Sequence, residues 1–256
     1  MMFKKIGKLS GLLLVLCLLP WARGASAQTI NPSDFTSITG PYVKALIETA
    51  AVTSLHRPLS SASPLGMAAG LEIGVDLSYV FFPTAFKDAL VAIGAGNISG
   101  IPVPKVNFRK GLPAHLDFGL SAITYAGMTM AGGDVQWALL SGMGPLPAVA
   151  ARVGYNYSSL FFLKTHTFNI DAVVSKNLFI FDPYLGLGTQ IVSGGIDVPL
   201  SLAGTFPVNL SSSYTGVLAH FFGGLSVKLL ILKIVGEVDY NFNGTTTYGA
   251  RAVLSF

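Results

Sequence analysis

The feature that most constrains this chain is a period-two alternation of apolar and polar residues, which recurs along most of its length. In the last run, residues 248–256, Tyr248 and every second residue to Phe256 are apolar, and Arg251 stands on the other face. Successive side chains of a strand point to opposite faces. A charge inside such a strand therefore needs a polar side to face. A membrane barrel provides one, because lipid lies outside it and the lumen lies inside.

The composition narrows the fold further. Charged residues make up 11% of the chain, against about 25% in an average soluble domain, and the mean hydropathy is +0.60. After the N-terminal leader no apolar run reaches the roughly 18 residues of a spanning helix. The longest candidate, 225–235, is interrupted by Lys228 and Lys233. Because lipid accepts only helices and closed barrels, the sequence favours a barrel over a soluble β-protein with an apolar surface.

Residues 1–27 have the three parts of a secretory signal peptide. A basic stretch containing Lys4, Lys5 and Lys8 precedes an apolar core at 12–19, and Ala25-Ser26-Ala27 follows as a small-residue cleavage site. We expect cleavage near Ala27. The only cysteine, Cys17, lies inside this leader and follows a leucine, which disfavours a lipoprotein signal. The exported chain would then contain no disulfide.

Removal of the leader also changes the charge balance. Four of the 16 Lys and Arg residues lie in 1–27, so twelve basic residues then face twelve acidic ones. A neutral chain without a basic patch gives no indication of nucleic-acid binding.

Residues 28–68 precede the alternation and are predicted to be a helical segment. Asn31-Pro32-Ser33-Asp34 has the pattern of a helix start, and a second helix is expected from Gly40-Pro41 to about Val52. The segment could lie beside the barrel in the periplasm or pack as a plug in its lumen or mouth. Its mildly polar far side favours the lumen or the mouth.

Residues 69–256 are predicted to form a closed antiparallel transmembrane barrel of about ten strands, with eight or twelve as alternatives. The class is all-β with an N-terminal helical segment. Bacterial single-chain barrels have even strand numbers. Residues 81–101 are expected to be a loop with a helical turn, 193–214 a long loop, and Lys176-Asn177 a tight turn. The strand at 102–109 is weak because it contains Pro102 and Pro104. The expected strands cover 71–79, 102–109, 115–122, 134–139, 149–157, 168–175, 184–191, 217–226, 234–242 and 248–256.

The alternation places ionisable side chains of both signs in the lumen, where they would pair to offset desolvation. Glu237 and Asp239 share a face with Arg251 on the next strand and are the expected ion cluster. Such a network could fill a closed barrel, or it could line a path for a ligand or ion. The predicted lumen residues are Glu72, Asp76, His115, Asp117, Asp134, Arg152, Asp171, His220, Glu237, Asp239 and Arg251.

No pattern of catalytic or metal-binding residues stands out. A hydrolase would need a nucleophile with a positioned histidine, and the His115–Asp117 pair alone does not provide that. His166 is expected in solvent near a loop. No nucleophile elbow, zinc motif or phosphate loop is present, so we expect no catalytic residue, no metal and no cofactor.

The final strand, with Tyr248, Leu254 and Phe256, resembles the C-terminal strand of bacterial outer-membrane barrels, which the assembly machinery reads. Lys110-Gly111-Leu112-Pro113 and Asp182-Pro183-Tyr184-Leu185-Gly186 are similar to segments of an uncharacterised group of such barrels. A looser similarity, through Asn31-Pro32, is to fatty-acid-transporter barrels with an N-terminal plug. The resemblance implies a bacterial outer-membrane location, with lipid and the assembly machinery as partners.

Three functions remain open at this point. The first is passive transport or binding of a small-molecule ligand, and the apolar residues between Ile191 and Leu210 motivate a hydrophobic one. The alternative is a structural barrel with a filled lumen that supports envelope integrity. The third and weakest is a lipid-modifying or proteolytic enzyme of the outer membrane.

Overall fold

The computed structural model describes residues 40–66, 70–92, 96–125, 128–142, 144–160, 163–202 and 206–256. The predicted signal peptide, its cleavage near Ala27 and the helix start at 31–34 lie outside these residues. Among the described residues, no helix is long and apolar enough to cross a membrane.

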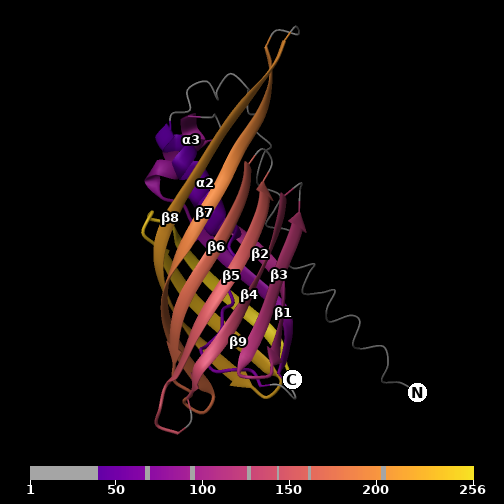
Figure 1. Cartoon of the computed structure of the whole chain (residues 1–256), viewed down its shortest axis with the longest axis vertical. Helices are drawn as coiled ribbons and strands as arrows, with labels where there is room; N and C mark the ends of the chain where they lie inside the picture. The colour runs from indigo at the N-terminus through magenta and orange to yellow at the C-terminus, as the bar shows by residue number, and fades with distance from the viewer. Residues whose placement is uncertain are drawn as a thin grey trace, which may run out of the picture.

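Ten antiparallel strands form a closed barrel, which confirms the predicted fold class (Figure 1). Each strand pairs with its neighbours in the chain, and β1 closes the ring against β10. The strands are β1 (Leu71–Phe81), β2 (Gly100–Leu112), β3 (Leu116–Tyr125), β4 (Met128–Ser141), β5 (Ala148–Leu160), β6 (Leu163–Ser175), β7 (Phe181–Leu202), β8 (Phe206–Leu229), β9 (Leu232–Asn241) and β10 (Thr246–Ser255).

The two ends of the barrel differ. At one end, called here the closing end, Leu71 and Phe256 exchange backbone hydrogen bonds of 3.1 and 2.9 Å. At the other end, called the hairpin end, β7 and β8 run on together as a long ribbon (Figure 1). The long loop expected at 193–214 is therefore wrong. Glycine and serine there do not stop the strands, because the backbones pair through Gly194 opposite Tyr214 and Gly195 opposite Ser213.

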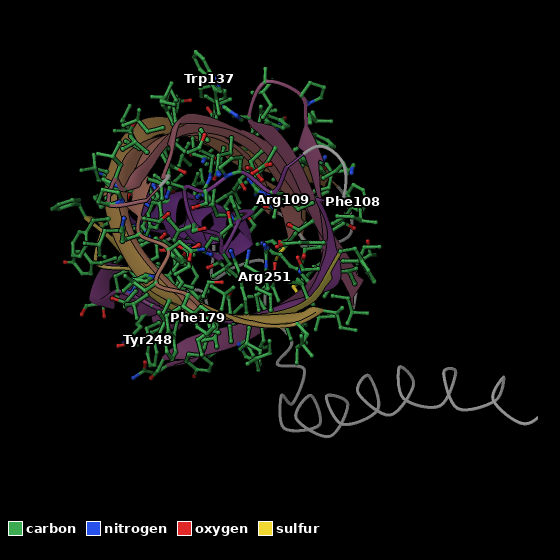
Figure 2. The ribbon with its side chains drawn as sticks, turned by 90° about the horizontal axis from the view of Figure 1, so that it is seen from below. Phe108, Arg109, Trp137, Phe179, Tyr248 and Arg251 are labelled. Atoms are coloured by element: carbon green, nitrogen blue, oxygen red, sulfur yellow. The ribbon has the colours of Figure 1, made fainter. Side chains whose placement is uncertain are left out.

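The barrel exposes apolar side chains around its circumference. Ile73, Leu187 and Val217 are 47%, 67% and 67% exposed on three different strands. Figure 2 shows Phe108 and Trp137 outside the wall, and Arg109 and Arg251 inside it. A soluble monomer rarely exposes so large an apolar area, whereas lipid covers it in a transmembrane barrel.

Two helices accompany the barrel in the described residues. Helix α2 (Gly40–Ser54) starts with proline at its second residue, a position that suits proline because the first turn needs no N–H partner. Almost all of its side chains from Val43 onward are buried, so it is surrounded by protein. Helix α3 (Thr84–Ala92) occupies the predicted 81–101 connection and packs against α2 at the hairpin end (Figure 1).

The wall is incomplete between β2 and β3. Their pairing ends at Val106 opposite Ala122, although β2 continues back to Gly100 and stays paired with β1. The Gly111 N–H donates to the Gly70 carbonyl, which lies on the β1 side. The backbone N–H and C=O groups of odd-numbered β2 residues therefore point toward β1, and those of even-numbered residues point toward β3. Pro102 and Pro104 are even-numbered, and because proline has no backbone N–H, neither can donate a hydrogen bond to β3. Two prolines thus separate the strands at the hairpin end.

Candidate functional site

The candidate site is the lumen, which is occupied by residues 40–66, called here the inner segment. It begins at the hairpin end, where Tyr214 Oη donates to Glu48 Oε1 at 2.6 Å. It reaches the closing end, where the Leu65 N–H bonds Asp117 Oδ1 at 3.1 Å. Figure 2 shows α2 inside the ring of strands when the barrel is viewed along its length. The segment therefore passes through the barrel from one end to the other.

Cations from the wall bind the backbone carbonyls of the inner segment. Lys105 Nζ donates to the carbonyls of Ser54 and Leu55, both at 2.6 Å. Arg152 Nη2 donates to the Ser60 carbonyl at 3.2 Å, and Arg251 donates to the carbonyls of Arg57 and Pro58. Pro58 disfavours helix before it, and a buried carbonyl without a partner is costly. These side chains replace the hydrogen bonds that a helix would have supplied.

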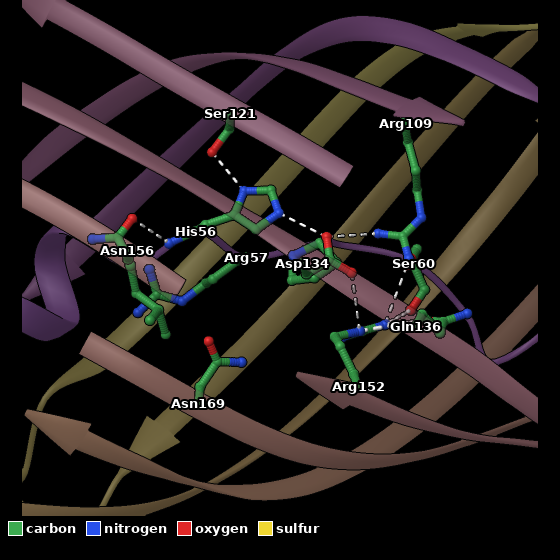
Figure 3. A network of polar contacts seen from close by, with 12 residues as sticks. His56, Arg57, Ser60, Arg109, Ser121, Asp134, Gln136, Arg152, Asn156 and Asn169 are labelled. Atoms are coloured by element: carbon green, nitrogen blue, oxygen red, sulfur yellow. Dashed lines mark hydrogen bonds and ion pairs between the residues drawn. The ribbon is translucent and has the colours of Figure 1, made fainter. Parts of the chain in front are cut away.

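The most enclosed ionic cluster is centred on Asp134 of β4 (Figure 3). His56 Nε2 lies 2.8 Å from Asp134 Oδ1, and Arg109 Nη1 lies 3.1 Å from the same oxygen. Arg152 Nε lies 3.9 Å from Asp134 Oδ2, and its Nη2 donates to Gln136 Oε1 at 2.7 Å. All of these side chains are buried. One carboxylate thus links three strands of the wall to the inner segment.

A second cluster surrounds His220 of β8. Its two ring nitrogens lie 3.1 Å from Asp171 Oδ1 and 3.1 Å from Asp239 Oδ2. Asp239 also faces Arg57 Nε of the inner segment at 3.5 Å. The network therefore continues around the lumen from β6 to β9.

The expected ion cluster of Glu237 and Asp239 with Arg251 is wrong. Arg251 bonds both oxygens of Asp76, at 2.6 and 2.8 Å. The register explains this, because Asp76 stands directly opposite Arg251 across the β1–β10 seam, whereas Val235 is its partner on β9. Glu237 instead accepts a hydrogen bond from Tyr184 Oη at 2.6 Å.

The predicted lumen position of His115 is also wrong. His115 is exposed in the turn between Leu112 and Leu116, which pair with each other. Because its φ is 59°, it belongs to the tight turn and not to the strand alternation. The other ten predicted lumen side chains are buried inside the barrel, although the predicted pairing with Arg251 is not formed. They are Glu72, Asp76, Asp117, Asp134, Arg152, Asp171, His220, Glu237, Asp239 and Arg251.

Sequence reasoning missed several buried members of the network, among them Lys105, Arg109, His56, Arg57 and Lys233, whose Nζ lies 2.9 Å from Glu72 Oε1. Lys105 and Arg109 alternate with outward residues along β2, so the signal was present, although the two prolines weakened that strand. His56 and Arg57 follow the end of α2 in a segment with no repeating pattern. Only the three-dimensional arrangement brings these two to the wall.

His56 also completes a serine–histidine–aspartate contact chain. Its Nδ1 lies 2.6 Å from Ser121 Oγ, while Nε2 faces Asp134. Ser121 and His56 are 5% and 4% exposed, and Asp134 is already shared with two arginines. A nucleophile needs room for the reacting carbonyl and donors for its oxygen. Ser121 is buried beside the inner segment and contacts it through His56, so these contacts anchor His56 to the wall. In the described residues no His, Cys, Asp and Glu cluster could hold a metal ion.

The hairpin-end half of the lumen is apolar. There α2 and α3 pack with lumen-facing residues of the wall in one buried cluster, which includes Ile47, Phe86, Val103, Met130 and Val192. The polar network fills the other half. The half of the lumen at the hairpin end is therefore apolar, and the half at the closing end is ionic.

The comparisons with known proteins show no family for this chain, because no family model and no curated protein matches its sequence. Among solved structures, the KdgM porin in complex with disordered oligogalacturonate is 10% identical, covers 72% of this chain and 99% of its own, and gives a TM-score of 0.39. The N-terminal β-barrel domain of Pseudomonas aeruginosa OprF is 12% identical, with coverages of 72% and 97% and a TM-score of 0.35. Ail, the attachment invasion locus protein of Yersinia pestis, is 14% identical, with coverages of 73% and 97% and a TM-score of 0.32.

None of the three is described as a fatty-acid transporter. The looser similarity to fatty-acid-transporter barrels gains no support from them.

Proposed function

We propose that this chain is an outer-membrane barrel of the bacterial envelope that its own inner segment holds closed. The observation that carries the proposal is the bonding of the segment's carbonyls by Lys105, Arg152 and Arg251 from three different strands. A segment held on several sides in a packed lumen leaves no continuous path for water. Passive transport through the lumen would then require the segment to move.

The proposed location rests on the apolar exterior of the closed barrel. In such barrels the short turns face the periplasm and the long loops face outward, so the hairpin end would face the cell exterior. Export would use the predicted signal peptide with cleavage near Ala27. Tyr248, Leu254 and Phe256, which are exposed on the outer face of the last strand, would serve the assembly machinery as its recognition signal.

Single-barrel conductance in planar bilayers tests the closed state. We expect the full chain to be silent and a variant without residues 40–66 to conduct. Migration on unheated gels, compared with heated samples, verifies that the shortened barrel has folded. Steady current through the full chain at low voltage would refute the proposal.

A tethered variant provides a test that keeps the segment in place. Ser63 Oγ and Ser175 Oγ lie 3.5 Å apart, so cysteines at both positions are close enough for a disulfide. The chain has no other cysteine beyond Cys17 in the leader. If the full chain opens briefly at high voltage, oxidation of the pair should abolish these openings and reduction should restore them. Ser63→Cys alone is the control.

Binding of a small apolar molecule is the second candidate function. The apolar half of the lumen favours it, because α2, α3 and the wall meet there in a buried apolar cluster. Radiolabelled palmitate in equilibrium dialysis tests it, with Val103→Gln as a variant that places a polar group in this half. Equal binding by the variant and the original chain would exclude this site.

A further inference from the structure

A groove of about 800 Å³ crosses the outer face of the wall over β2 to β6. Its middle contains the smallest outward residues of this face, Ala122, Ala131 and Gly133, which occupy neighbouring places in the strand register. Larger side chains stand around them, so the surface is hollowed. The apolar residues around the hollow are Val106, Phe108, Phe118, Leu120, Val135, Val153, Tyr155, Tyr157 and Phe168.

The split in the wall borders this groove. Val106 and Ala122 both line the groove, and they form the last pair before β2 and β3 separate. Pro102 and Pro104 keep the strands apart beyond that pair. The groove thus lies where the outward side chains are small. Toward the hairpin end it borders the point where the pairing of β2 with β3 ends.

Polar side chains follow the groove at its hairpin end. The register places Thr124 opposite Thr129, Thr129 opposite Ser159, and Ser159 opposite Lys164. These residues form one outward row, two positions along each strand beyond Ala122, Ala131 and Tyr157. Thr124 Oγ1 and Thr129 Oγ1 lie 3.4 Å apart, and Lys164 is exposed at the end of the row.

A second polar group lies between this row and the groove. His166 Nδ1 is 2.6 Å from Tyr155 Oη, and the His166 ring centroid is 5.2 Å from that of Tyr157. Both tyrosines line the groove. His166, which the sequence placed near a loop in solvent, is an exposed strand residue beside the aromatic rim.

We propose that this groove seats one acyl chain of a phosphate-bearing anionic membrane lipid, whose headgroup lies against Lys164, His166 and the hydroxyl row. An apolar seat followed by hydroxyls and a cation matches the order of chain and headgroup in a lipid, and anionic lipids attract such cations. The lipid-facing position of the groove favours a lipid over a protein partner. The inference rests on the proposed membrane location and is independent of whether the lumen is closed.

Filling the groove tests the seat for the chain. Ala131→Trp occupies the hollow from its centre, while Ala219→Trp adds the same side chain to an outward position on β8, outside the groove. The barrel is reconstituted with palmitoyl-oleoyl phosphatidylglycerol, extracted into mild detergent and weighed by native mass spectrometry. We expect one retained lipid for the original chain and for Ala219→Trp, and affinity lowered at least about tenfold for Ala131→Trp.

The headgroup contacts are tested by changing both partners. Lys164→Gln should weaken phosphatidylglycerol binding about fivefold and should reduce its preference over phosphatidylcholine of the same chains. Lys87→Gln, on α3 away from the groove, should change neither. Gel migration before and after heating verifies that each variant is folded.

Three results would overturn the proposal. One is no retained lipid on the original chain. Another is equal retention by Ala131→Trp and Ala219→Trp. The third is free palmitate competing as well as phosphatidylglycerol, which would assign the groove to a fatty acid. Conductance of the full chain, in contrast, would refute the closed lumen and leave this site in place.

Discussion

Asp134 provides the sharpest test of how the lumen stabilises the barrel. Its carboxylate accepts from Arg109 Nη1 at 3.1 Å, faces His56 Nε2 at 2.8 Å and lies 3.9 Å from Arg152 Nε. Removing one partner of a buried pair leaves the others charged without compensation, which costs about 3–5 kcal/mol. We therefore expect Asp134→Ala to lower the free energy of unfolding by that amount. Asp134→Asn keeps one acceptor oxygen and should cost about 1.5–3 kcal/mol.

Urea unfolding of the refolded barrel in lipid measures this change. With about 1–3 kcal/mol lost per molar urea, Asp134→Ala should move the midpoint down by at least about 1 M. The two tryptophans of the full sequence include Trp137, which lies outside the wall on β4, and only this one remains after the leader is removed. Its fluorescence follows the transition in the strand that carries Asp134.

Two controls isolate the cause. Asp88→Ala removes an exposed carboxylate from α3 and should change the stability by less than about 0.5 kcal/mol. A double-mutant cycle of His56→Ala with Asp134→Ala should give a coupling energy of about 1.5–3 kcal/mol. Each single variant already loses the hydrogen bond to the charged carboxylate, so the double variant should cost less than the sum of the two. If Asp134→Ala and Asp88→Ala unfold at the same urea concentration, the network does not stabilise the barrel.

Three further predictions concern how the inner segment is held. An added methyl group in Gly132→Ala would lie 2.7 Å from the His56 Cβ, and in Gly249→Ala it would lie 2.8 Å from the flexible Leu59 Cδ2. Urea unfolding should therefore show a loss of about 1–3 kcal/mol for the first and less for the second, and the reverse order would contradict this packing. Arg251→Met should cost about 3–5 kcal/mol and expose the segment to limited proteolysis, whereas unchanged cleavage would show that Arg251 does not hold it. Tyr214→Phe removes only the bond to Glu48, so hydrogen exchange in α2 should quicken with a stability loss of about 0.5–1.5 kcal/mol. Unchanged exchange would rule out that anchor.

The sequence predicted the barrel because its alternation is a local property of each strand. Asp76, Asp171 and Arg251 stand at every second position among apolar neighbours, so the face of each was readable. The partner of each charge was not readable in the same way, since it depends on the register between strands. Arg251 meets Asp76 only because the last strand pairs with the first at that register.

The inner segment shows a second limit of sequence reasoning. The helix from Gly40 was predicted from its apolar spacing, and the structure has it at Gly40–Ser54. Residues 55–66 have no period, and their conformation is imposed by contacts with distant strands such as those of Lys105 and Arg152. The sequence indicates a weak strand at Pro102 and Pro104. It does not indicate which neighbouring strand loses its hydrogen bonds there, because that depends on the register between β1 and β2.

The path of the inner segment constrains the order of assembly. The described chain runs between the two ends of the barrel eleven times, ten times as a strand of the wall and once as the inner segment along the axis. In a finished cylinder the segment would have to thread past the interior side chains of Lys105, Arg152 and Arg251 before its carbonyls could accept their hydrogen bonds. We therefore expect the first and last strands to join only after the axial crossing is in position. Arg251, which bonds Asp76 across the seam and the Arg57 carbonyl on the axis, would couple the final closure to a correctly filled interior.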